Sequence, residues 1–547
     1  MRLKTISSLE KCFLDEDINQ KIEYKRATML KNEIFHFCLA YVNEEGRSFF
    51  NFKIESEISD YISTERIETV PVRHAANPAH ADELFLRKTP GLYPDLLQPL
   101  EQNKRLIATN QLKSLMIEID PAGNVPAGTY MINLILENEN EKYSKCFDIE
   151  IIDAELPGQD LIYTQWFYCD SLADYYETES FDDKHFNIIE NFAKTAVRYG
   201  VNMLLTPVFT PPLDTYVGGE RRTMQLVKIK KDNNVYNFDF SLLDKWIEMC
   251  DRIGVKYFEI PHLFTQWGAK AAPKIMAEVN GEYMRIFGWD TPADGKEYKE
   301  FLKVFIPAFI EHMKQNNGAD KRCFFHISDE PDETQLECFL KAKEIVEPLL
   351  EGYPIIDAIS SYKLYKMAKL SSPISSTLYI DEFIKNHTEN LWAYYCALEA
   401  VDNLSNRFIS MPSLRNRILG IQLYKYGIKG FLHWGYNFYY NQFSYAFVNP
   451  FLCTDGEYFG PAGDEFSVYP GPAGQPWKSL RLEIFYDALQ DIRALSFCEK
   501  LYGKDFVMDI IEGKGKIDFK NYPHDDEYIL DVRERINRAI KERDGKI

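Results

Sequence analysis

Hydrophobic and polar residues alternate along the first part of the chain, up to about residue 156. A period of two is typical of strands that bury one face of a sheet. Turn-forming residues separate the alternating segments, so we predict an antiparallel β-sandwich for residues 1–156. The predicted strands are residues 34–42, 50–58, 112–119, 129–136 and 143–152. Residues 90–95, with the sequence PGLYPD, are expected to form a loop that reaches a neighbouring domain.

The pattern changes after residue 158, where short apolar segments alternate with longer amphipathic ones. Apolar residues recur there at spacings of three and four, which predicts helices at residues 186–199, 241–253, 298–313 and 336–349. Short apolar segments predict eight strands, at residues 161–167, 201–205, 255–261, 323–327, 354–359, 375–379, 391–395 and 428–434. Eight successive strand–helix units indicate a (β/α)8 TIM barrel over residues 159–500.

The last part of the chain is predicted to be helical. A helix at residues 479–499 would complete the barrel, and a charged amphipathic helix lies near residues 528–542. We expect residues 501–547 to form a helical tail packed on the barrel. The segment 437–477 is too long for an ordinary connection and is rich in glycine, so it is expected to be a lid, a binding element or a disordered loop.

Composition and charge limit the classes of partner. A chain of 547 residues exceeds one hydrophobic core, so several domains are expected. A formal net charge of −20 at pH 7 argues against a nucleic-acid or membrane partner. We see no secretion signal near the first residue and no apolar run of the ~20 residues that cross a bilayer. The scattered cysteines are typical of reduced, buried thiols, so a cytoplasmic protein is expected; its oligomeric state is left open.

The strongest candidate for chemistry is the segment 322–331, which reads RCFFHISDEP. Asp329 and Glu330 follow a predicted buried strand, and Pro331 disfavours helical geometry at Glu330. Two carboxylates this close repel each other, so one of them holds a proton to a higher pH than a free side chain would. The pair therefore offers an acid beside a base. The alternative interpretation is an acidic loop in which Asp329 caps the following helix.

The other predicted strand ends carry aromatic and polar residues, and barrel enzymes build their sites at these ends. Aromatic faces edged by amides and carboxylates suit a sugar ring. The candidate substrate-binding residues are Trp166, His262, Gln266, Trp267, Tyr395, Trp434 and Asn437. Each of the aromatic residues could instead belong to the barrel core, and each histidine could be a buried structural residue.

The chain lacks the usual signatures of metal and nucleotide sites. It has no CxxC pair, no HExxH, no P-loop and no GxGxxG. We therefore expect neither a metal nor a cofactor. Hydrolysis without a cofactor is compatible with the candidate residues.

Several motifs together resemble glycoside hydrolase family 123 and its broader relatives over most of the chain. The resemblance is carried by PGLYPD at 90–95, HLFTQWGAK at 262–270, SDEP at 328–331, GFLHWGYN at 430–437 and SLRLE at 479–483. It implies a β-sandwich before a (β/α)8 catalytic domain. It also implies a β-N-acetylgalactosaminidase. Because no secretion signal is seen, we expect the substrate to be a short oligosaccharide or glycoside rather than an intact glycolipid or polysaccharide.

The resemblance implies different roles for the two carboxyl groups. Asp329 would orient the 2-acetamido group of the substrate, and Glu330 would protonate the glycosidic oxygen. A retaining enzyme with its own nucleophile needs two carboxyl groups about 5–5.5 Å apart across the sugar, which adjacent residues reach poorly. We therefore expect a retaining exo-glycosidase that works through an oxazolinium intermediate. The alternatives are a barrel hydrolase for another β-linked sugar, an inactive carbohydrate-binding protein and a metal-dependent hydrolase.

Overall fold

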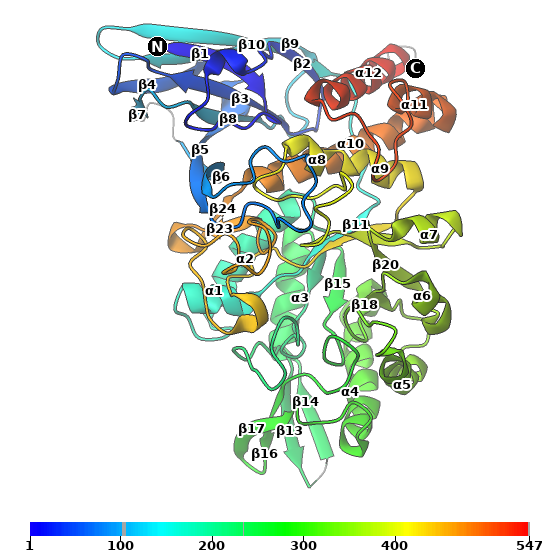
Figure 1. Ribbon diagram of the computed structural model, residues 1–547. Helices are drawn as coiled ribbons and strands as arrows, with labels where there is room; N and C mark the ends of the chain where they lie inside the picture. Colours follow the sequence, from blue (N-terminus) through cyan, green and yellow to red (C-terminus); the bar gives the residue numbers. More distant parts are fainter. Residues whose placement is uncertain (101–104, 234, 545–547) are drawn as a thin grey trace.

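The computed structural model describes residues 1–100, 105–233 and 235–544. Figure 1 shows two β-sheets from the first part of the chain at one end of the molecule and a small extra sheet at the other end. The barrel lies between them. The N-terminal sheets and the small extra sheet thus lie at opposite ends of the barrel.

The N-terminal region consists of two five-stranded sheets. The first has the order β1 (Arg2–Ser7), β3 (Phe35–Val42), β8 (Lys113–Ile119), β5 (Ile62–Val72) and β6 (Gly91–Pro99). The second has the order β2 (Arg26–Leu30), β10 (Lys142–Ile152), β9 (Gly128–Glu137), β4 (Ser48–Glu55) and β7 (Arg105–Ala108). Phe37 and Phe147 stack between the sheets at 4.0 Å. The predicted sandwich is confirmed, with one parallel pair, β2 and β10.

One N-terminal prediction is wrong. Residues 90–95 were expected to be a loop, but residues 91–95 belong to strand β6. Proline is tolerated there because β6 is an edge strand, and because the register shifts beside Thr69, the partner of Pro94. The segment does reach the barrel, since Asp95 forms an ion pair with Arg481.

Eight parallel strands form the barrel, which confirms the predicted (β/α)8 fold. They are β11 (Ile162–Gln165), β12 (Met203–Leu205), β15 (Tyr257–Ile260), β18 (Cys323–Phe325), β19 (Ile356–Ala358), β20 (Ser372–Ser376), β21 (Trp392–Tyr394) and β22 (Gly430–His433). β22 pairs with β11 and closes the ring. Between β18 and β19, the described residues form a single bridge, Phe325 with Ile355.

The sixth strand lies three residues earlier than predicted. β20 covers Ser372–Ser376, whereas the prediction was 375–379. Its sequence, SPISS, is poor in apolar residues, so the hydrophobic pattern pointed instead to the turn that follows. All five residues of β20 are nevertheless buried, because barrel and helices cover the two faces of a parallel strand.

Helices follow most of the strands. They are α1 (Cys169–Tyr175), α2 (Asp183–Arg198), α3 (Ser241–Ile253), α4 (Lys296–Gln315), α5 (Leu336–Val346), α6 (Tyr362–Ala368), α7 (Ile380–Lys385), α8 (Ser413–Arg417), α9 (Leu419–Tyr426) and α10 (Leu480–Tyr502). Local signals set their ends. Asp182 caps α2 by accepting a hydrogen bond from the backbone N–H of His185, and Gly254 ends α3 with φ of +89°.

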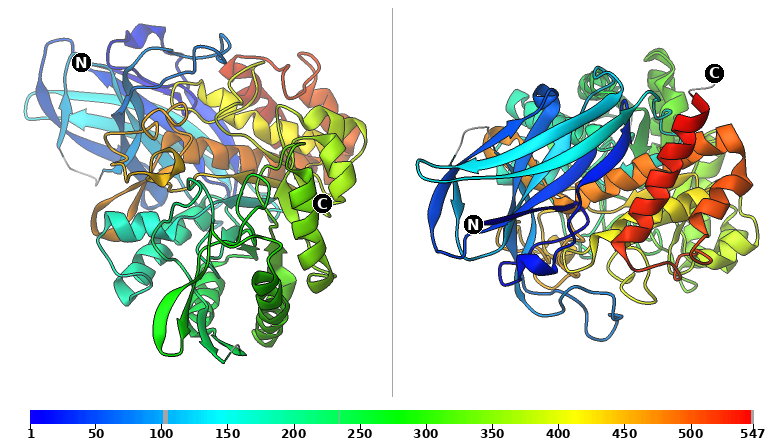
Figure 2. Two further views of the ribbon diagram at one scale, coloured as in Figure 1. Left: turned by 60° about the horizontal axis from the view of Figure 1, so that its bottom comes forward. Right: turned by 90° about the horizontal axis from the view of Figure 1, so that it is seen from above.

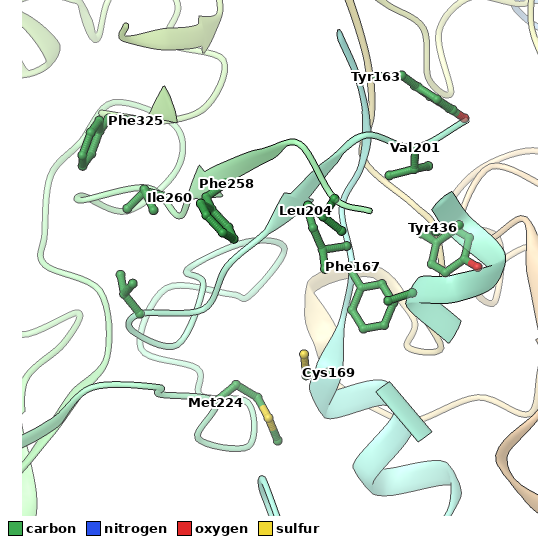
Figure 3. Packing of buried hydrophobic residues seen from close by; sticks show 14 of the residues in the cluster. Tyr163, Phe167, Cys169, Val201, Leu204, Met224, Phe258, Ile260, Phe325 and Tyr436 are labelled. Carbon is green, nitrogen blue, oxygen red and sulfur yellow. The ribbon is translucent and has the colours of Figure 1, made fainter. Parts of the chain in front are cut away.

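Alternate residues of each barrel strand face opposite sides. Met203 and Leu205 belong to the apolar group inside the barrel, whereas Leu204 packs outward among the helices. Figure 3 shows part of this outer layer, where Leu204, Phe258 and Ile260 lie among the buried side chains. This parity decides which side chains can approach the carboxyl end of the barrel from inside.

A four-stranded sheet extends from the carboxyl-end loops of the barrel. It has the order β14 (Val235–Asp239), β13 (Lys228–Asp232), β16 (Ile275–Val279) and β17 (Glu282–Phe287), and it forms the end of the molecule opposite the sandwich (Figure 1). The long segment 437–477 contains a second, short hairpin of β23 (Val468–Pro470) and β24 (Pro476–Lys478). Both features were absent from the sequence prediction.

The C-terminal helices α11 (Lys504–Ile511) and α12 (Asp526–Asp544) follow the barrel. α12 lies beside the sandwich in the right-hand view of Figure 2. Arg533 of α12 forms ion pairs with Asp491 of α10 and with Glu33. Each helix in the described ranges is too short or too polar to cross a bilayer.

Candidate active site

The adjacent carboxyl groups lie directly beyond strand β18. Asp329 is buried, and its backbone oxygen accepts a hydrogen bond of 3.0 Å from the backbone N–H of Trp267. Glu330 keeps solvent contact and has φ of +43°, a left-handed conformation that is strained for a residue other than glycine. The hydroxyl of Tyr394, at the end of β21, donates a hydrogen bond of 2.5 Å to the Glu330 carboxylate.

The surroundings make this pair retain a proton. Burial, and then the charge of Glu330, raise the pKa of Asp329 well above its ordinary value. Enclosure by the protein also raises the pKa of Glu330, against the hydrogen bond from Tyr394, which favours the ionised form. Because the two groups titrate together, these pKa values describe the pair. One acidic and one ionised carboxyl group can therefore coexist here.

A charged histidine lies under the pair, inside the barrel. One His326 nitrogen lies 2.8 Å from the carboxylate of Glu259, and the other lies 3.2 Å from Asp357. Burial opposes the charge of His326, but the hydrogen bonds to Asp357 and Glu259 outweigh burial and raise its pKa to about 9. A positive His326 stabilises a negative charge on Asp329, whose pKa it lowers.

His262 stacks on His326 with ring centroids 4.2 Å apart. Burial and the charge of His326 lower the pKa of His262 well below its usual value, so its ring is neutral. Neither of its ring nitrogens has a hydrogen-bond partner among the described residues. His262, His326 and Asp357 are close enough to share a metal ion. Both His326 nitrogens already face carboxylates, however, and stacked rings direct their lone pairs along nearly parallel planes, which suits a hydrogen-bonded group better than a tetrahedral metal site.

The loop after β15 joins the pair to two other loops. The side-chain oxygen of Gln266 accepts a hydrogen bond from the backbone N–H of Asp214, in the loop after β12. Trp267 is half-buried and contacts Phe443 edge-on at 5.5 Å between ring centroids. Burial, opposed by Arg221, raises the pKa of Asp214 to about 7. The Asp214 carboxyl therefore adds a third titratable group near Asp329.

Two tryptophans belong to the inner wall. Trp166 is buried and donates from its indole nitrogen to Glu259 at 2.8 Å. Trp434 is half-buried and donates from its indole nitrogen to Asp464 at 3.1 Å. Both rings pack in the same apolar group as Tyr394. Their orientation is thus fixed by buried carboxylates.

Two predicted binding residues are not brought to the pair. Tyr395 faces the helix layer, where its hydroxyl donates to Asn416 at 2.9 Å. Asn437 is buried and clamps the backbone of Tyr168, accepting from its N–H at 2.9 Å and donating to its carbonyl oxygen at 3.0 Å. Both side chains therefore hold the barrel together.

Sequence reasoning missed the residue that contacts Glu330. Parity along β21 was the signal that could have found it, because Trp392 and Tyr394 share one face and Tyr395 lies on the other. Glu259 in the middle of β15 has a similar signal, since a carboxylate inside an apolar strand needs a buried partner. Asp214 and Arg221 carry no local signal, as they lie in an irregular loop.

Two sizeable cavities lie elsewhere on the surface. One of about 660 Å³ lies between the sandwich and α12, where its lining includes Tyr24 and Leu530. Another of about 720 Å³ is lined by the four-stranded sheet and Phe181. The carboxylate pair belongs to neither of them.

Comparisons with known proteins identify the family. The model of the glycoside hydrolase 123 catalytic domain matches residues 166–498. The solved structure of a family 123 glycoside hydrolase from Clostridium perfringens has a TM-score of 0.76 and 15% identity, with 100% of this chain and 99% of that chain covered. No curated protein matches the chain.

Other solved structures are much less similar. β-Glucuronidase 3 from Bacteroides uniformis has a TM-score of 0.30 at 9% identity, covering 84% of this chain and 50% of that one. The endo-β-1,4-mannanase from Thermotoga petrophila has a TM-score of 0.33 at 11% identity, covering 62% and 78%. Both TM-scores are too low to indicate a shared fold over the whole chain. The family model matches more than half of the residues of the present chain. The chain therefore belongs to glycoside hydrolase family 123 and is a glycoside hydrolase.

Proposed function

We propose that this enzyme removes a terminal β-linked 2-acetamido-2-deoxy sugar, preferably N-acetylgalactosamine, with retention of configuration and with assistance from the substrate. The supporting observation is the adjacency of Asp329 and Glu330, of which Glu330 is held by Tyr394. Adjacent carboxyl groups on one loop are poorly placed to flank a sugar as nucleophile and acid. The acetamide oxygen of the substrate supplies the missing nucleophile.

In the first step, the acetamide carbonyl oxygen attacks C1 of the sugar while the bond from C1 to the leaving oxygen breaks. Glu330 donates its proton to that leaving oxygen. Asp329 accepts a hydrogen bond from the acetamide N–H and balances the positive charge of the bicyclic oxazolinium. Because the leaving group departs from the β face, the intermediate is bonded on the α face.

In the second step, Glu330 acts as a base. It takes a proton from water, and the water oxygen attacks C1 from the β face while the bond from C1 to the acetamide oxygen breaks. The product therefore keeps the β configuration. Glu330 ends the cycle protonated, ready for another substrate.

The electrostatics of the site support a carboxyl pair that shares one proton. The pair holds its proton to a higher pH than an isolated carboxyl group would, which a general acid needs. His326 opposes the rise in the pKa of Asp329 that burial and Glu330 cause, and the proposed mechanism assigns the shared proton to Glu330. We assign sugar binding to Trp166, Trp267 and Trp434, with Gln266 and His262 as hydrogen-bonding residues.

The sugar preference rests on the family. The Clostridium perfringens relative hydrolyses glycolipid glycans. A glycan leaving group is therefore compatible with this barrel. The preference for N-acetylgalactosamine over N-acetylglucosamine comes from the resemblance of the motifs. It concerns a single hydroxyl group, and one hydrogen bond to such a group can decide between two sugars.

The test is hydrolysis of three aryl β-glycosides, derived from N-acetylgalactosamine, N-acetylglucosamine and galactose. We expect activity on the first, less on the second and none on galactose, because galactose has no acetamido group. Asp329→Asn and Glu330→Gln should each lower kcat/KM by orders of magnitude, with Glu330→Gln least impaired on the best leaving group. Proton NMR of the first product should show the β anomer.

Three outcomes separate the rival functions. Equal cleavage of the galactoside would contradict substrate assistance and favour a hydrolase for another β-linked sugar. An α anomer as first product would contradict retention. Tight sugar binding by the folded protein without any turnover would favour an inactive binding protein.

A further inference from the structure

A row of aromatic rings extends outward from the carboxylate pair. It begins at Trp267, whose backbone N–H is bonded to Asp329. Trp267 meets Phe443 at 5.5 Å, Phe443 meets Tyr445 at 6.3 Å, and Tyr445 stacks on Tyr216 at 4.6 Å, all between ring centroids. We call these four residues the aromatic ridge. Its inner end is hydrogen-bonded to the backbone of Asp329, and its outer end is open to solvent.

Three different loops build the aromatic ridge. Tyr216 follows β12, Trp267 follows β15, and Phe443 and Tyr445 lie in the long segment after β22. Hydrogen bonds join these loops, since the hydroxyl of Ser444 donates to the backbone oxygen of Asp214 at 2.7 Å. The N–H of Tyr216 also donates to the backbone oxygen of Phe443 at 3.3 Å. The ridge is therefore a built surface, in which rings from distant parts of the chain are held in successive contact.

The backbone of the ridge is strained. Trp267, Phe443 and Ser444 have φ values of +57°, +60° and +55°. Each such residue costs about 1–3 kcal/mol unless its surroundings compensate, and such residues gather at ligand sites. Gly219 makes room for the ring of Tyr216, because a Cβ there would lie 2.6 Å from that ring. The strained backbone and the lack of a side chain at Gly219 both help to place these rings.

The outer rings are exposed. Tyr445 is 65% exposed and Tyr216 is 40% exposed, although they stack on each other with an angle of 12° between their planes. Tyr445 therefore keeps most of its side chain in solvent while one face of its ring stacks on Tyr216, and part of Tyr216 is also open to solvent. Tyrosine faces of this kind bind the C–H face of a sugar while the hydroxyl groups around the edge stay hydrated. A lipid chain would instead need a closed apolar groove.

We propose that the aromatic ridge is the binding site for the leaving-group sugar, the ring to which the terminal 2-acetamido sugar is attached. This assignment rests on the proposed function, because it takes the position of Asp329 and Glu330 as the cleavage point. Tyr445 and Tyr216 hold the apolar face of the second sugar. The ridge therefore selects glycan substrates over simple glycosides.

The test compares two substrates with the same terminal sugar. One is methyl β-N-acetylgalactosaminide, whose leaving group is too small to reach the outer rings. The other is a trisaccharide that carries a terminal β-N-acetylgalactosamine on galactose. We expect Tyr445→Ala to lower kcat/KM for the trisaccharide about tenfold and to leave that for the methyl glycoside within twofold. Tyr216→Ala should act in the same direction.

Tyr458→Ala is the matched control. Tyr458 lies in the same long segment and is 64% exposed, but it packs against Arg73 and His74 of the N-terminal region. Tyr458→Ala should not change kcat/KM for one substrate more than for the other. An equal loss on both substrates with Tyr445→Ala, or no loss on either, would overturn the proposed subsite.

A binding measurement separates failure of the subsite from failure of the proposed function. Wild type inactive on both substrates would contradict the function. Titration calorimetry of the trisaccharide against Glu330→Gln, with and without Tyr445→Ala, then still tests the ridge. We expect the dissociation constant to be at least fivefold larger when Tyr445 is replaced by alanine. Unchanged affinity, or an absence of binding to Glu330→Gln, would overturn the ridge as a sugar site.

Discussion

Tyr394 and Tyr395 are neighbours in the chain and are both buried, yet their hydroxyl groups serve different layers of the molecule. Tyr394 donates to Glu330 from inside the barrel, and Tyr395 donates to Asn416 among the helices. Two chemically identical side chains, one residue apart, therefore give a matched pair of probes. One tests the electrostatics of the proposed acid, and the other tests only packing.

Tyr394→Phe should move the alkaline limb of the pH profile. The hydrogen bond from Tyr394 lowers the pKa of Glu330, so its removal raises that pKa. Glu330 then stays protonated to a higher pH, and the alkaline limb of kcat/KM moves upward. We also expect the maximal kcat/KM to fall about tenfold or more, because a hydrogen bond to a charged group is lost. The measurement is kcat/KM against pH with the aryl β-N-acetylgalactosaminide.

Tyr395→Phe removes a hydroxyl of similar burial on the opposite face. It should reduce stability by about 1 kcal/mol and leave both limbs of the pH profile in place. A shift of the same size in both variants would show that Tyr394 acts through packing rather than through Glu330.

His326→Gln tests the charge beneath the pair. The positive ring lowers the pKa of Asp329, so its loss raises that pKa. Because the proposed mechanism needs Asp329 ionised, the acid limb of kcat/KM should move to higher pH. His185→Gln is the control, since burial lowers the pKa of His185 to about 4 and its ring bonds to the backbone of Cys169. An acid limb that moves equally in both variants would argue against this role of His326.

At the scale of elements, the hydrophobic pattern alone located seven of the eight barrel strands, because most buried parallel strands are continuous apolar runs. It placed β20 wrongly, where SPISS is buried without being apolar. It missed the four-stranded sheet, whose strand β14 alternates exposed and half-buried residues and has no buried residue. The pair Asp329–Glu330 could be proposed from sequence. The contact of Glu330 with Tyr394 could not be predicted from sequence. The side of the strand on which a side chain lies depends on its position along the strand and on how the barrel closes, rather than on residue type.

Gly430→Ala should disturb the pairing of β21 with β22. Gly430 lies opposite Trp392, and a Cβ there would come within 2.1 Å of the indole ring. We expect a loss of about 1–3 kcal/mol from overpacking, together with lower activity, because Trp392 precedes Tyr394 on the same face. Gly158→Ala, where a Cβ meets nothing within 4 Å, should leave both unchanged. Urea unfolding and kcat/KM are the measurements, and equal stability of the two variants would contradict the argument.

At the scale of the whole molecule, buried ion pairs join the sandwich to the barrel. His36 of β3 lies 3.0 Å from Asp487 of α10, and Asp95 of β6 binds Arg481 of α10 through two hydrogen bonds of 2.9 Å. Tyr469 also donates to Asp95 at 2.6 Å. The sandwich is therefore fixed to the helix that follows the last barrel strand.

Asp95→Asn should destabilise the protein strongly. It leaves the buried Arg481 charge without its partner, which costs about 3–5 kcal/mol. Asp15→Asn is the matched control, because Asp15 also holds an arginine, Arg87, through two hydrogen bonds but is 70% exposed. Its loss should stay within about 1 kcal/mol. Thermal unfolding measures both, and similar melting temperatures would show that the interface tolerates the unpaired charge.

The single bridge between β18 and β19 has a consequence for how the site moves. A strand held by a full ladder on both sides opens only with its neighbours, whereas one joined by a lone bridge can fluctuate locally and exchange its amide hydrogens sooner. β18 leads directly to Asp329 and Glu330. A weakly paired seam of the barrel thus lies beside the residues that must serve a departing oxygen and then an arriving water.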